Sequence, residues 1–226
     1  MKVVAVMPAW NEAPRIAEAV RGVGRHVERV IVVDDGSHDE TSSHARAAGA
    51  SVVRHPVNRG QGAALRTGTL AALKIGAEVI VHVDADGQQD PEALPLLLAP
   101  LLADEVDVVY GSRFLGVEAE GMPWSRRSVL GAARFFSAYA LGIPRTMTDP
   151  QSGLRAMRAS VAHALPFEQD KMAHCSEILR LVTCSSWRWK EVPVRVRYTE
   201  ETLEKGNKTS DALTIAWHLL LGTFQR

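Results

Sequence analysis

The chain has 226 residues, of which 46% are hydrophobic and 23% are charged. This composition excludes a disordered or fibrous protein and is sufficient for one sizeable α/β core. Lysine plus arginine and aspartate plus glutamate number 26 each, so net charge provides no general attraction for nucleic acid or an anionic membrane. We therefore expect a single globular domain over residues 1–226 and no nucleic-acid partner.

Neither an export signal nor a membrane-spanning helix is predicted. The chain begins almost directly with the strand-like run Val3 to Met7, without the basic start and long apolar stretch of a signal peptide. The longest apolar stretches, Val129 to Ile143 and Leu213 to Leu221, are shorter than the roughly 20 residues that cross a bilayer. Cys175 and Cys184 fall at opposite ends of a predicted helix, too far apart for a disulfide, so buried reduced thiols are expected. These features predict a cytoplasmic protein.

Short β-branched segments alternate with longer helical patterns in the first half of the chain. The predicted strands are Val3–Val6, Val30–Val33, Ser51–Arg54, Val79–Val83 and Val106–Tyr110. The predicted helices between them are Ala13–Val23, Asp39–Ala48, Gly62–Ile75 and Pro91–Leu102. This rhythm predicts an α/β fold, with a mostly parallel central sheet and helices on both faces.

The second half of the chain has a different pattern, with glycine, arginine and aromatic residues mixed together after about residue 111. We expect a helical stretch at Trp124–Leu141, a loop at Thr148–Gly153 and a late strand at Trp189–Tyr198. The polar, glycine-containing segment 200–210 is a candidate mobile loop, either a lid or a plain surface loop. The two halves are predicted to form one domain.

Acidic side chains follow the predicted strand Val79–Val83, where Asp84, Ala85, Asp86, Gly87 and Gln88 occur in succession. Ligands bind at the carboxyl ends of parallel strands. Two carboxylates and an amide oxygen suit Mg²⁺ or Mn²⁺, ions that keep positions open for phosphate oxygens. On its own, this short pattern favours an acidic turn that only caps the loop. A metal site therefore needs support from other motifs.

Two further predicted strands end in polar residues. Asp34 and Asp35 follow Val30–Val33, and one carboxylate there could accept from a base N–H or a ribose hydroxyl; alternatively both belong to the turn, as we expect for Asp35. The first strand leads into Pro8–Glu12, where the ring of Trp10 and nearby polar groups could hold a nucleobase. We expect these strand ends to converge on one crevice.

Five motifs that occur in order make the prediction specific. They are Pro8–Glu12 (PAWNE), Val32–Ser37 (VVDDGS), Asn58–Gly62 (NRGQG), Asp84–Pro91 (DADGQQDP) and Gly111–Phe114 (GSRF). Together they resemble the family 2 glycosyltransferases, and most of all the branch of dolichol-phosphate mannose synthases and polyprenyl-phosphate glycosyltransferases. Thr148–Ala156 and Glu191–Val194 are also similar to that branch, so the resemblance covers roughly residues 3–198.

The resemblance implies a GT-A fold, with residues 1–110 as the nucleotide-sugar half and residues 111–226 as the acceptor half. Its implied metal ligands for Mg²⁺ or Mn²⁺ are Asp84, Asp86 and Gln88, and its implied nucleotide-binding residues are Pro8, Trp10, Glu12, Asp34, Asp84, Ala85 and Asp86. Arg113 is the implied contact for an acceptor phosphate, with Arg126 and Lys208 as further candidates. Trp10 stands where a tyrosine is commoner in the family, and Gly87 where an apolar residue is common.

The resemblance also implies a function: an inverting, metal-dependent transferase that moves a sugar from a GDP-mannose or UDP-glucose type of donor to a polyprenyl or dolichyl phosphate. Its implied catalytic residues are Asp86 and Arg113. If the acceptor is instead a hydroxyl of a soluble molecule, a base is needed, and Asp149 is the candidate, although it could equally cap the turn at Pro150. A non-catalytic nucleotide-sugar-binding protein is the alternative of another class.

Peripheral contact with a membrane is a further expectation, because a lipid-phosphate acceptor lies in a bilayer. Trp124–Leu141 and Leu213–Leu221 combine apolar or aromatic residues with a few polar ones, so either could lie in the membrane interface. Packing in the protein core is the alternative for both segments.

Overall fold

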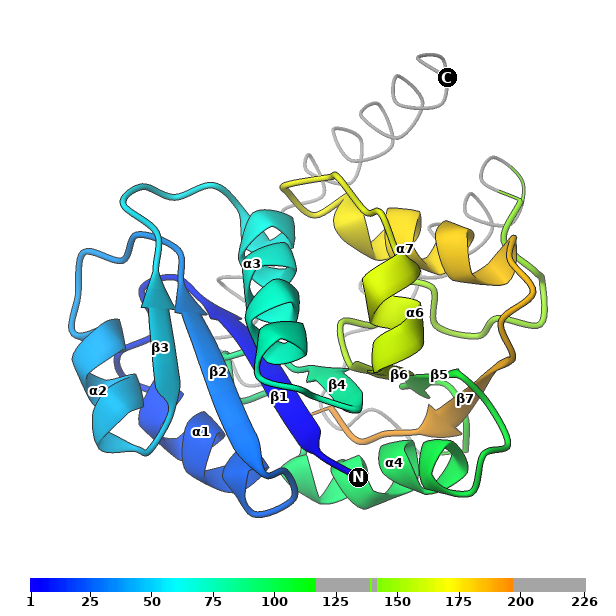
Figure 1. The fold of residues 1–226 in the computed structure, drawn as a ribbon, viewed down its shortest axis with the longest axis horizontal. Coiled ribbons are helices and arrows are strands. Elements are labelled where there is room, and N and C mark those ends of the chain that lie inside the picture. The colour runs from blue at the N-terminus through cyan, green and yellow to red at the C-terminus, as the bar shows by residue number, and fades with distance from the viewer. Residues whose placement is uncertain (117–138, 140–141, 197–226) are drawn as a thin grey trace.

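The computed structural model describes residues 1–116, 139 and 142–196 (Figure 1). In chain order the elements are β1 (Val3–Ala9), α1 (Ile16–Gly24), β2 (Arg29–Asp34), α2 (Thr41–Ala47), β3 (Ser51–Arg54), α3 (Gln61–Lys74), β4 (Val79–His82), η1 (Pro91–Ala93), α4 (Leu94–Leu102), β5 (Val108–Ser112), β6 (Arg155–Arg158), α6 (Ala159–Ala164), α7 (His174–Thr183) and β7 (Trp189–Pro193). Apart from Tyr139, the predicted helix over 124–141, the segments 200–210 and 213–221, and the candidate residues Arg126 and Lys208 lie outside the described residues.

A seven-stranded sheet in the order β3-β2-β1-β4-β6-β5-β7 forms the centre of the described part (Figure 1). Neighbouring strands are parallel except at β6, which runs antiparallel to both β4 and β5. The predicted α/β fold with a mostly parallel sheet is confirmed. Strand β6 was not predicted, because its sequence RAMR contains no β-branched residue; pairing with strands on both sides makes it extended.

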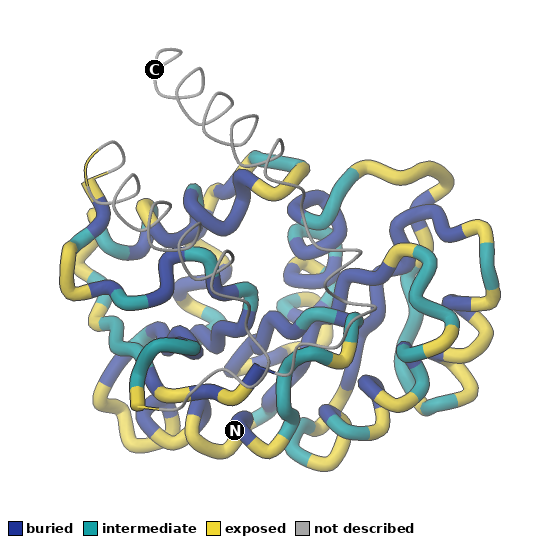
Figure 2. The backbone as a smooth tube through the Cα atoms, turned by 180° about the vertical axis from the view of Figure 1, so that it is seen from behind, coloured by how far each residue is buried: buried dark blue, intermediate teal, exposed yellow. Residues whose placement is uncertain are grey.

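Helices cover both faces of the sheet, as predicted, and each face has its own apolar core. In β1, Val3, Ala5 and Met7 pack in the core shared with α1, α2 and α4. The alternate residues Val4 and Val6 pack in the core shared with α3, α6 and α7. Strands buried on two faces read as continuous apolar runs, which explains why the early strands were easy to predict. Figure 2 shows the same arrangement as a buried centre with exposed connections.

Several element boundaries differ from the prediction by a few residues. Helix α1 begins at Ile16 rather than Ala13, and the main-chain N–H of Ala13 donates to the Asp39 carboxylate in a neighbouring loop. The predicted helix Pro91–Leu102 consists of the short 3₁₀ turn η1 followed by α4. The late strand β7 ends at Pro193. These shifts leave the order of the elements from β1 to β5 as predicted.

The two cysteines are free, as expected from their spacing. Cys175 is buried near the start of α7, but Cys184 follows the end of that helix and is exposed. The expectation that both thiols are buried was therefore wrong for Cys184. The helix places the two residues at opposite ends, with one facing the core and the other facing solvent.

Helix α3 lies directly on β1 and β2 because a glycine faces the sheet. A Cβ atom built on Gly68 would stand 2.2 Å from Cγ1 of Val6 and 3.0 Å from Cγ2 of Val33. Real atoms do not approach so closely, so any larger residue would push the helix away from the sheet. This contact matters for the site, because Gln61, the first residue of α3, lines the cavity described below.

We predict that Gly68→Ala destabilises the fold by about 1–2 kcal/mol. An approach this close to Val6 falls in the upper part of the overpacking range, roughly 2–3 kcal/mol, while alanine recovers about 1 kcal/mol of helix propensity. Denaturant unfolding measures the difference. Gly24→Ala is the matched control, because its Cβ would meet only Val30, at 3.9 Å. A Gly68→Ala protein at least as stable as the wild type would contradict this account of the helix contact.

Candidate active site

A cavity of about 400 Å³ lies at the carboxyl ends of β1 and β4, and we call it the strand-end cavity. Of the residues expected from the sequence to form the site, those that line it are Pro8, Trp10, Glu12, Asp84, Ala85, Asp86, Gln88 and Arg113. Asp34 and Asp149 are not among its lining residues. The convergence of strand ends expected from the sequence is therefore present in the fold.

The loop that follows β1 is fixed by hydrogen bonds to the loop that follows β2. The main-chain N–H of Asn11 donates to Ser37 Oγ at 3.0 Å, and the side-chain oxygen of Asn11 accepts from the N–H of His38 at 2.8 Å. The N–H of Glu12 donates to Thr41 Oγ1 at 2.9 Å. With its loop held in this way, Trp10 stays 51% exposed at the cavity, which leaves a large aromatic surface available to a ligand.

The two aspartates after β2 have different surroundings. Asp34 is fully buried and accepts hydrogen bonds from the N–H of Ser37 and from the Ser42 hydroxyl. Burial would raise the pKa of Asp34, but these hydrogen bonds outweigh it and lower that pKa. Asp34 therefore lies beneath the cavity and fixes the turn, which differs from its expected place in the nucleotide pocket.

Asp35, expected to be only a turn residue, lines the cavity instead. Its carboxylate accepts from the main-chain N–H groups of Arg59 and Gly60, at 2.7–3.1 Å. It also lies 2.6 Å from Nδ1 of His55, whose Nε2 lies 2.9 Å from Thr67 Oγ1. Asp35 thereby ties the end of β2 to the loop that leads into α3.

Asp84 and Asp86 lie just after β4 and both face the cavity. Burial, and then the neighbouring charge of Asp86, raises the pKa of Asp84 to about 7. Oδ1 of Asp86 accepts from the main-chain N–H of Gln88 at 2.9 Å, which closes a tight turn. Two carboxylates held this close repel each other, and a divalent cation would relieve that repulsion.

The donor set at this turn fits a hard cation. Among the described residues, no group of three or more histidine, cysteine, aspartate or glutamate side chains is arranged to hold a metal ion. A site here therefore depends on the oxygens of Asp84 and Asp86, the amide oxygen of Gln88 and oxygens from a ligand or water, all suited to Mg²⁺ or Mn²⁺. The resemblance implied the same three residues.

The segment before β6 closes the cavity from the other side. A Cβ atom on Gly153 would stand 2.5 Å from Oδ2 of Asp84, so only glycine lets the main chain pass this carboxylate. Gln151 and Ser152 line the same wall. Because β6 runs antiparallel to β4, the start of β6 lies beside the end of β4. Gly153 therefore approaches Asp84 because of β6, the strand that was not predicted from the sequence.

Arg113, just after β5, forms a two-pronged ion pair with Asp149. Its Nε and Nη2 donate to the two carboxylate oxygens, each at 2.7 Å, and its main-chain N–H donates to Oδ2 at 3.1 Å. Asp149 is 1% exposed, and its own N–H donates to the Glu191 carboxylate at 2.9 Å. The guanidinium is thus fixed at the cavity wall, where the resemblance placed a phosphate contact.

Sequence reasoning gave no role to several residues of the cavity. Gln61 and Gln89 contact Asp84 directly, and Met172 comes from the loop before α7. The two glutamines belong to the motifs Asn58–Gly62 and Asp84–Pro91, so the sequence already indicated that they lie near the site. Their contacts were not, because those contacts depend on how the strands are ordered.

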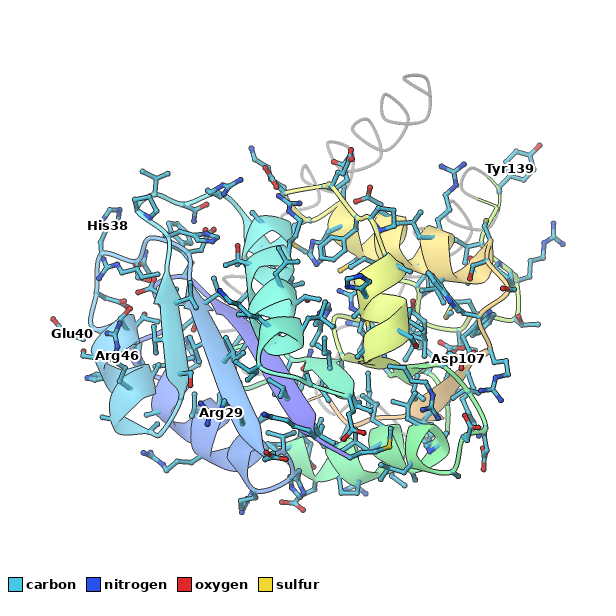
Figure 3. All side chains as sticks on the ribbon, in the orientation of Figure 1. Arg29, His38, Glu40, Arg46, Asp107 and Tyr139 are labelled. Atoms are coloured by element: carbon cyan, nitrogen blue, oxygen red, sulfur yellow. The ribbon has the colours of Figure 1, made fainter. Side chains whose placement is uncertain are left out.

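Within the described residues, no helix is long and apolar enough to span a bilayer. Tyr139 belongs to the segment considered for the interface. It is 82% exposed and projects outward from the fold (Figure 3).

Comparison with known proteins agrees with this geometry. The family described as glycosyl transferase family 2 matches residues 4–165. The chain is 29% identical to a UDP-N-acetylglucosamine–dolichyl-phosphate N-acetylglucosaminyltransferase of Methanococcus voltae, over 96% of this chain and 94% of that protein. It is 31% identical to an undecaprenyl-phosphate mannosyltransferase of Micrococcus luteus, over 74% of this chain and 71% of that protein.

A solved structure supports the fold independently. Glucosyl-3-phosphoglycerate synthase from Mycobacterium tuberculosis, in complex with Mn²⁺, UDP and glucosyl-3-phosphoglycerate, superposes with a TM-score of 0.73 over 97% of this chain and 77% of that one, at 23% identity. The fold, the strand-end motifs and the family match over most of the chain lead to one conclusion: the chain belongs to glycosyltransferase family 2 and has a GT-A fold.

Proposed function

We propose that this glycosyltransferase moves a sugar, with inversion, from a nucleoside diphosphate donor to a polyprenyl phosphate, and that it needs Mg²⁺ or Mn²⁺. The observation that carries the proposal is the strand-end cavity, which has Trp10, Asp35 and the Asp84–Asp86 turn on one side and Arg113 on the other. The printed names of the two sequence relatives include a UDP-sugar donor in one case and a polyprenyl-phosphate acceptor in both.

The donor side combines an aromatic surface with carboxylates. The ring of Trp10 is available to stack on a base, and the Glu12 carboxylate can accept hydrogen bonds from base or ribose. Asp86, with Asp84 and Gln88, would hold the divalent ion next to the diphosphate. The ion would offset the negative charge that develops on the departing nucleoside diphosphate.

The acceptor side favours a group that is already ionised. Both oxygens of Asp149 are bound to Arg113 and the side chain is 1% exposed, so Asp149 is poorly placed to take a proton from a hydroxyl. A phosphate oxygen needs no base, and a fixed guanidinium can bind it by charge-assisted hydrogen bonds. Asp149 is then a residue that orients Arg113 rather than the base considered from the sequence.

Metal-dependent donor binding gives the direct test of the proposed function. Asp86→Ala is expected to abolish Mn²⁺-dependent binding of the cognate nucleoside diphosphate while the fold is kept, because Asp86 is a partly exposed turn residue outside both cores. Calorimetry with UDP and GDP, with and without Mn²⁺, measures it. Unchanged affinity in a folded variant would remove Asp86 from the metal site, and donor binding without any transfer would indicate the non-catalytic alternative.

The acceptor class is tested at Arg113 and Asp149. With a phosphate acceptor, Arg113→Lys is expected to weaken acceptor use by about 10-fold to 100-fold, roughly 1.4–2.8 kcal/mol. Lysine keeps the positive charge but lacks the paired, planar N–H donors of the guanidinium. Asp149→Asn is expected to weaken it by about 10-fold through loss of the ion pair. Donor affinity should change little in either variant, and Arg180→Lys, at an exposed position on α7, is the control.

A hydroxyl acceptor would produce a different pattern in the same assays. Asp149→Asn would then lower kcat by on the order of 100-fold or more, even at saturating acceptor, because a base is lost. Rates with a short-chain polyprenyl phosphate and with a panel of soluble sugars distinguish the two cases. Transfer by the wild type to soluble hydroxyls alone would contradict the proposed acceptor.

Gly153→Ala tests the close approach to the metal turn. The added methyl group would stand 2.5 Å from the Asp84 carboxylate and displace it, so we expect Mn²⁺-dependent nucleotide binding to weaken by about 10-fold or more. Binding of acceptor phosphate should be less affected. A Gly153→Ala protein with wild-type Mn²⁺ affinity would show that the position of Asp84 is unimportant for the ion.

A further inference from the structure

The Asp84 carboxylate is held from two sides by side-chain amides. Nε2 of Gln61 donates to Oδ1 at 2.7 Å, and Nε2 of Gln89 donates to Oδ2 at 2.7 Å. Gln89 makes a second bond, because its Oε1 accepts from the main-chain N–H of Asp84 at 3.2 Å. Rotation of the carboxylate would break at least one of these bonds, so its plane is fixed before any ligand binds.

The main chain that carries Gln61 is itself anchored. The N–H of the preceding residue, Gly60, donates to Asp35 at 2.7 Å, and the N–H of the following residue, Gly62, donates to the Asp170 carbonyl at 2.8 Å. Gln61 is the first residue of α3, whose position on the sheet is set by the tight Gly68 contact. The amide therefore reaches Asp84 from a rigid element, and it links the β2 side of the cavity to the β4 side.

Gln89 is anchored from the opposite direction. It forms an isolated antiparallel bridge with Val196, and the N–H of Asp90 donates to the Arg195 carbonyl at 3.4 Å. The next turn is capped by Asp90, whose carboxylate accepts from the N–H of Glu92 at 3.1 Å. The second amide is therefore held by the segment that follows β7.

One hydrogen bond on each oxygen still leaves room for a cation. An ionised carboxylate has about four lone-pair positions, of which two receive the amides. Neutral amides orient the carboxylate without cancelling its charge, unlike an arginine or lysine partner. An oriented, uncancelled carboxylate is what a divalent ion needs from a preformed ligand.

We propose that Gln61 and Gln89 are positioning residues that hold the Asp84 carboxylate in the orientation in which it meets the metal–diphosphate part of the donor. This inference rests on the proposed function, and it adds two residues to which the resemblance gave no role. They act through Asp84 and touch neither the ion nor the reacting atoms.

Methionine substitutions test the proposal, because methionine has nearly the length of glutamine but no N–H donor. The Mn²⁺ affinity of Gln61→Met, Gln89→Met and the double variant is measured by calorimetry at a saturating concentration of UDP or GDP, whichever the wild type binds. Each single variant is expected to bind Mn²⁺ about 3-fold to 10-fold more weakly, as for loss of one or two hydrogen bonds, and the double variant about 10-fold to 100-fold more weakly. Gln169→Met is the control, because the main-chain N–H of Gln169 makes the hydrogen bond to Glu177 and the substitution keeps that N–H.

A second measurement separates positioning from a merely structural role. At limiting Mn²⁺ the donor KM of the variants should rise, whereas kcat should recover at saturating Mn²⁺, and the metal-free melting temperature should stay within the range of the control. If a methionine variant does not fold, Gln61→Asn or Gln89→Asn replaces it, because asparagine keeps the amide but is too short to reach Asp84.

Wild-type Mn²⁺ affinity in the double variant would overturn the proposal, as would a loss of affinity matched by an equal loss of metal-free stability. A wild-type protein that binds neither UDP nor GDP with Mn²⁺ would overturn the proposed function, and this inference with it. The two failures are therefore distinguishable from the wild-type titration alone.

Discussion

The reversed strand β6 is the constraint on which the geometry of the site depends. It lies between β4 and β5 and runs against both, so the segment that precedes it arrives at the carboxyl end of β4. Gly153 then passes the Asp84 carboxylate at a distance that no side chain allows. The same segment carries Asp149 to Arg113 after β5, and one reversal thus brings both Gly153 and Asp149 to the strand-end cavity or its wall.

The charges of the cavity are arranged differently on its two sides. Asp35 is held by main-chain N–H groups and by His55, and Asp84 is held by two neutral amides. The Asp84 carboxylate lies close to Asp86 and, among the described residues, has no arginine or lysine hydrogen-bonded to it, which favours a divalent cation there. On the opposite side, Asp149 fixes the Arg113 guanidinium and balances its positive charge. The arrangement of the N–H donors of Arg113, more than the net charge of the pair, would therefore select the acceptor.

The sequence predicted the early strands and helices well, because strands buried on both faces are continuous apolar runs and the helices between them have clear spacing. It did not predict β6, whose four residues are extended only because they pair on both sides. The same limit applied to the site. Asp84 and Asp86 follow a strand and could be recognised. Which of Asp34 and Asp35 lines the cavity could not, because it depends on contacts with the loops around them. The amides of Gln61 and Gln89 likewise meet Asp84 only once the sheet is assembled.

Under the proposed function, the strand-end cavity binds a nucleoside diphosphate through a divalent ion at the Asp84–Asp86 turn. A crystal structure of the protein with Mn²⁺ and the nucleoside diphosphate that binds it, with data collected at the manganese absorption edge, tests this most directly. We expect an anomalous peak beside the Asp86 carboxylate, with the diphosphate between that peak and Arg113. A peak elsewhere, or a diphosphate bound in this cavity with no ion beside Asp86, would contradict it.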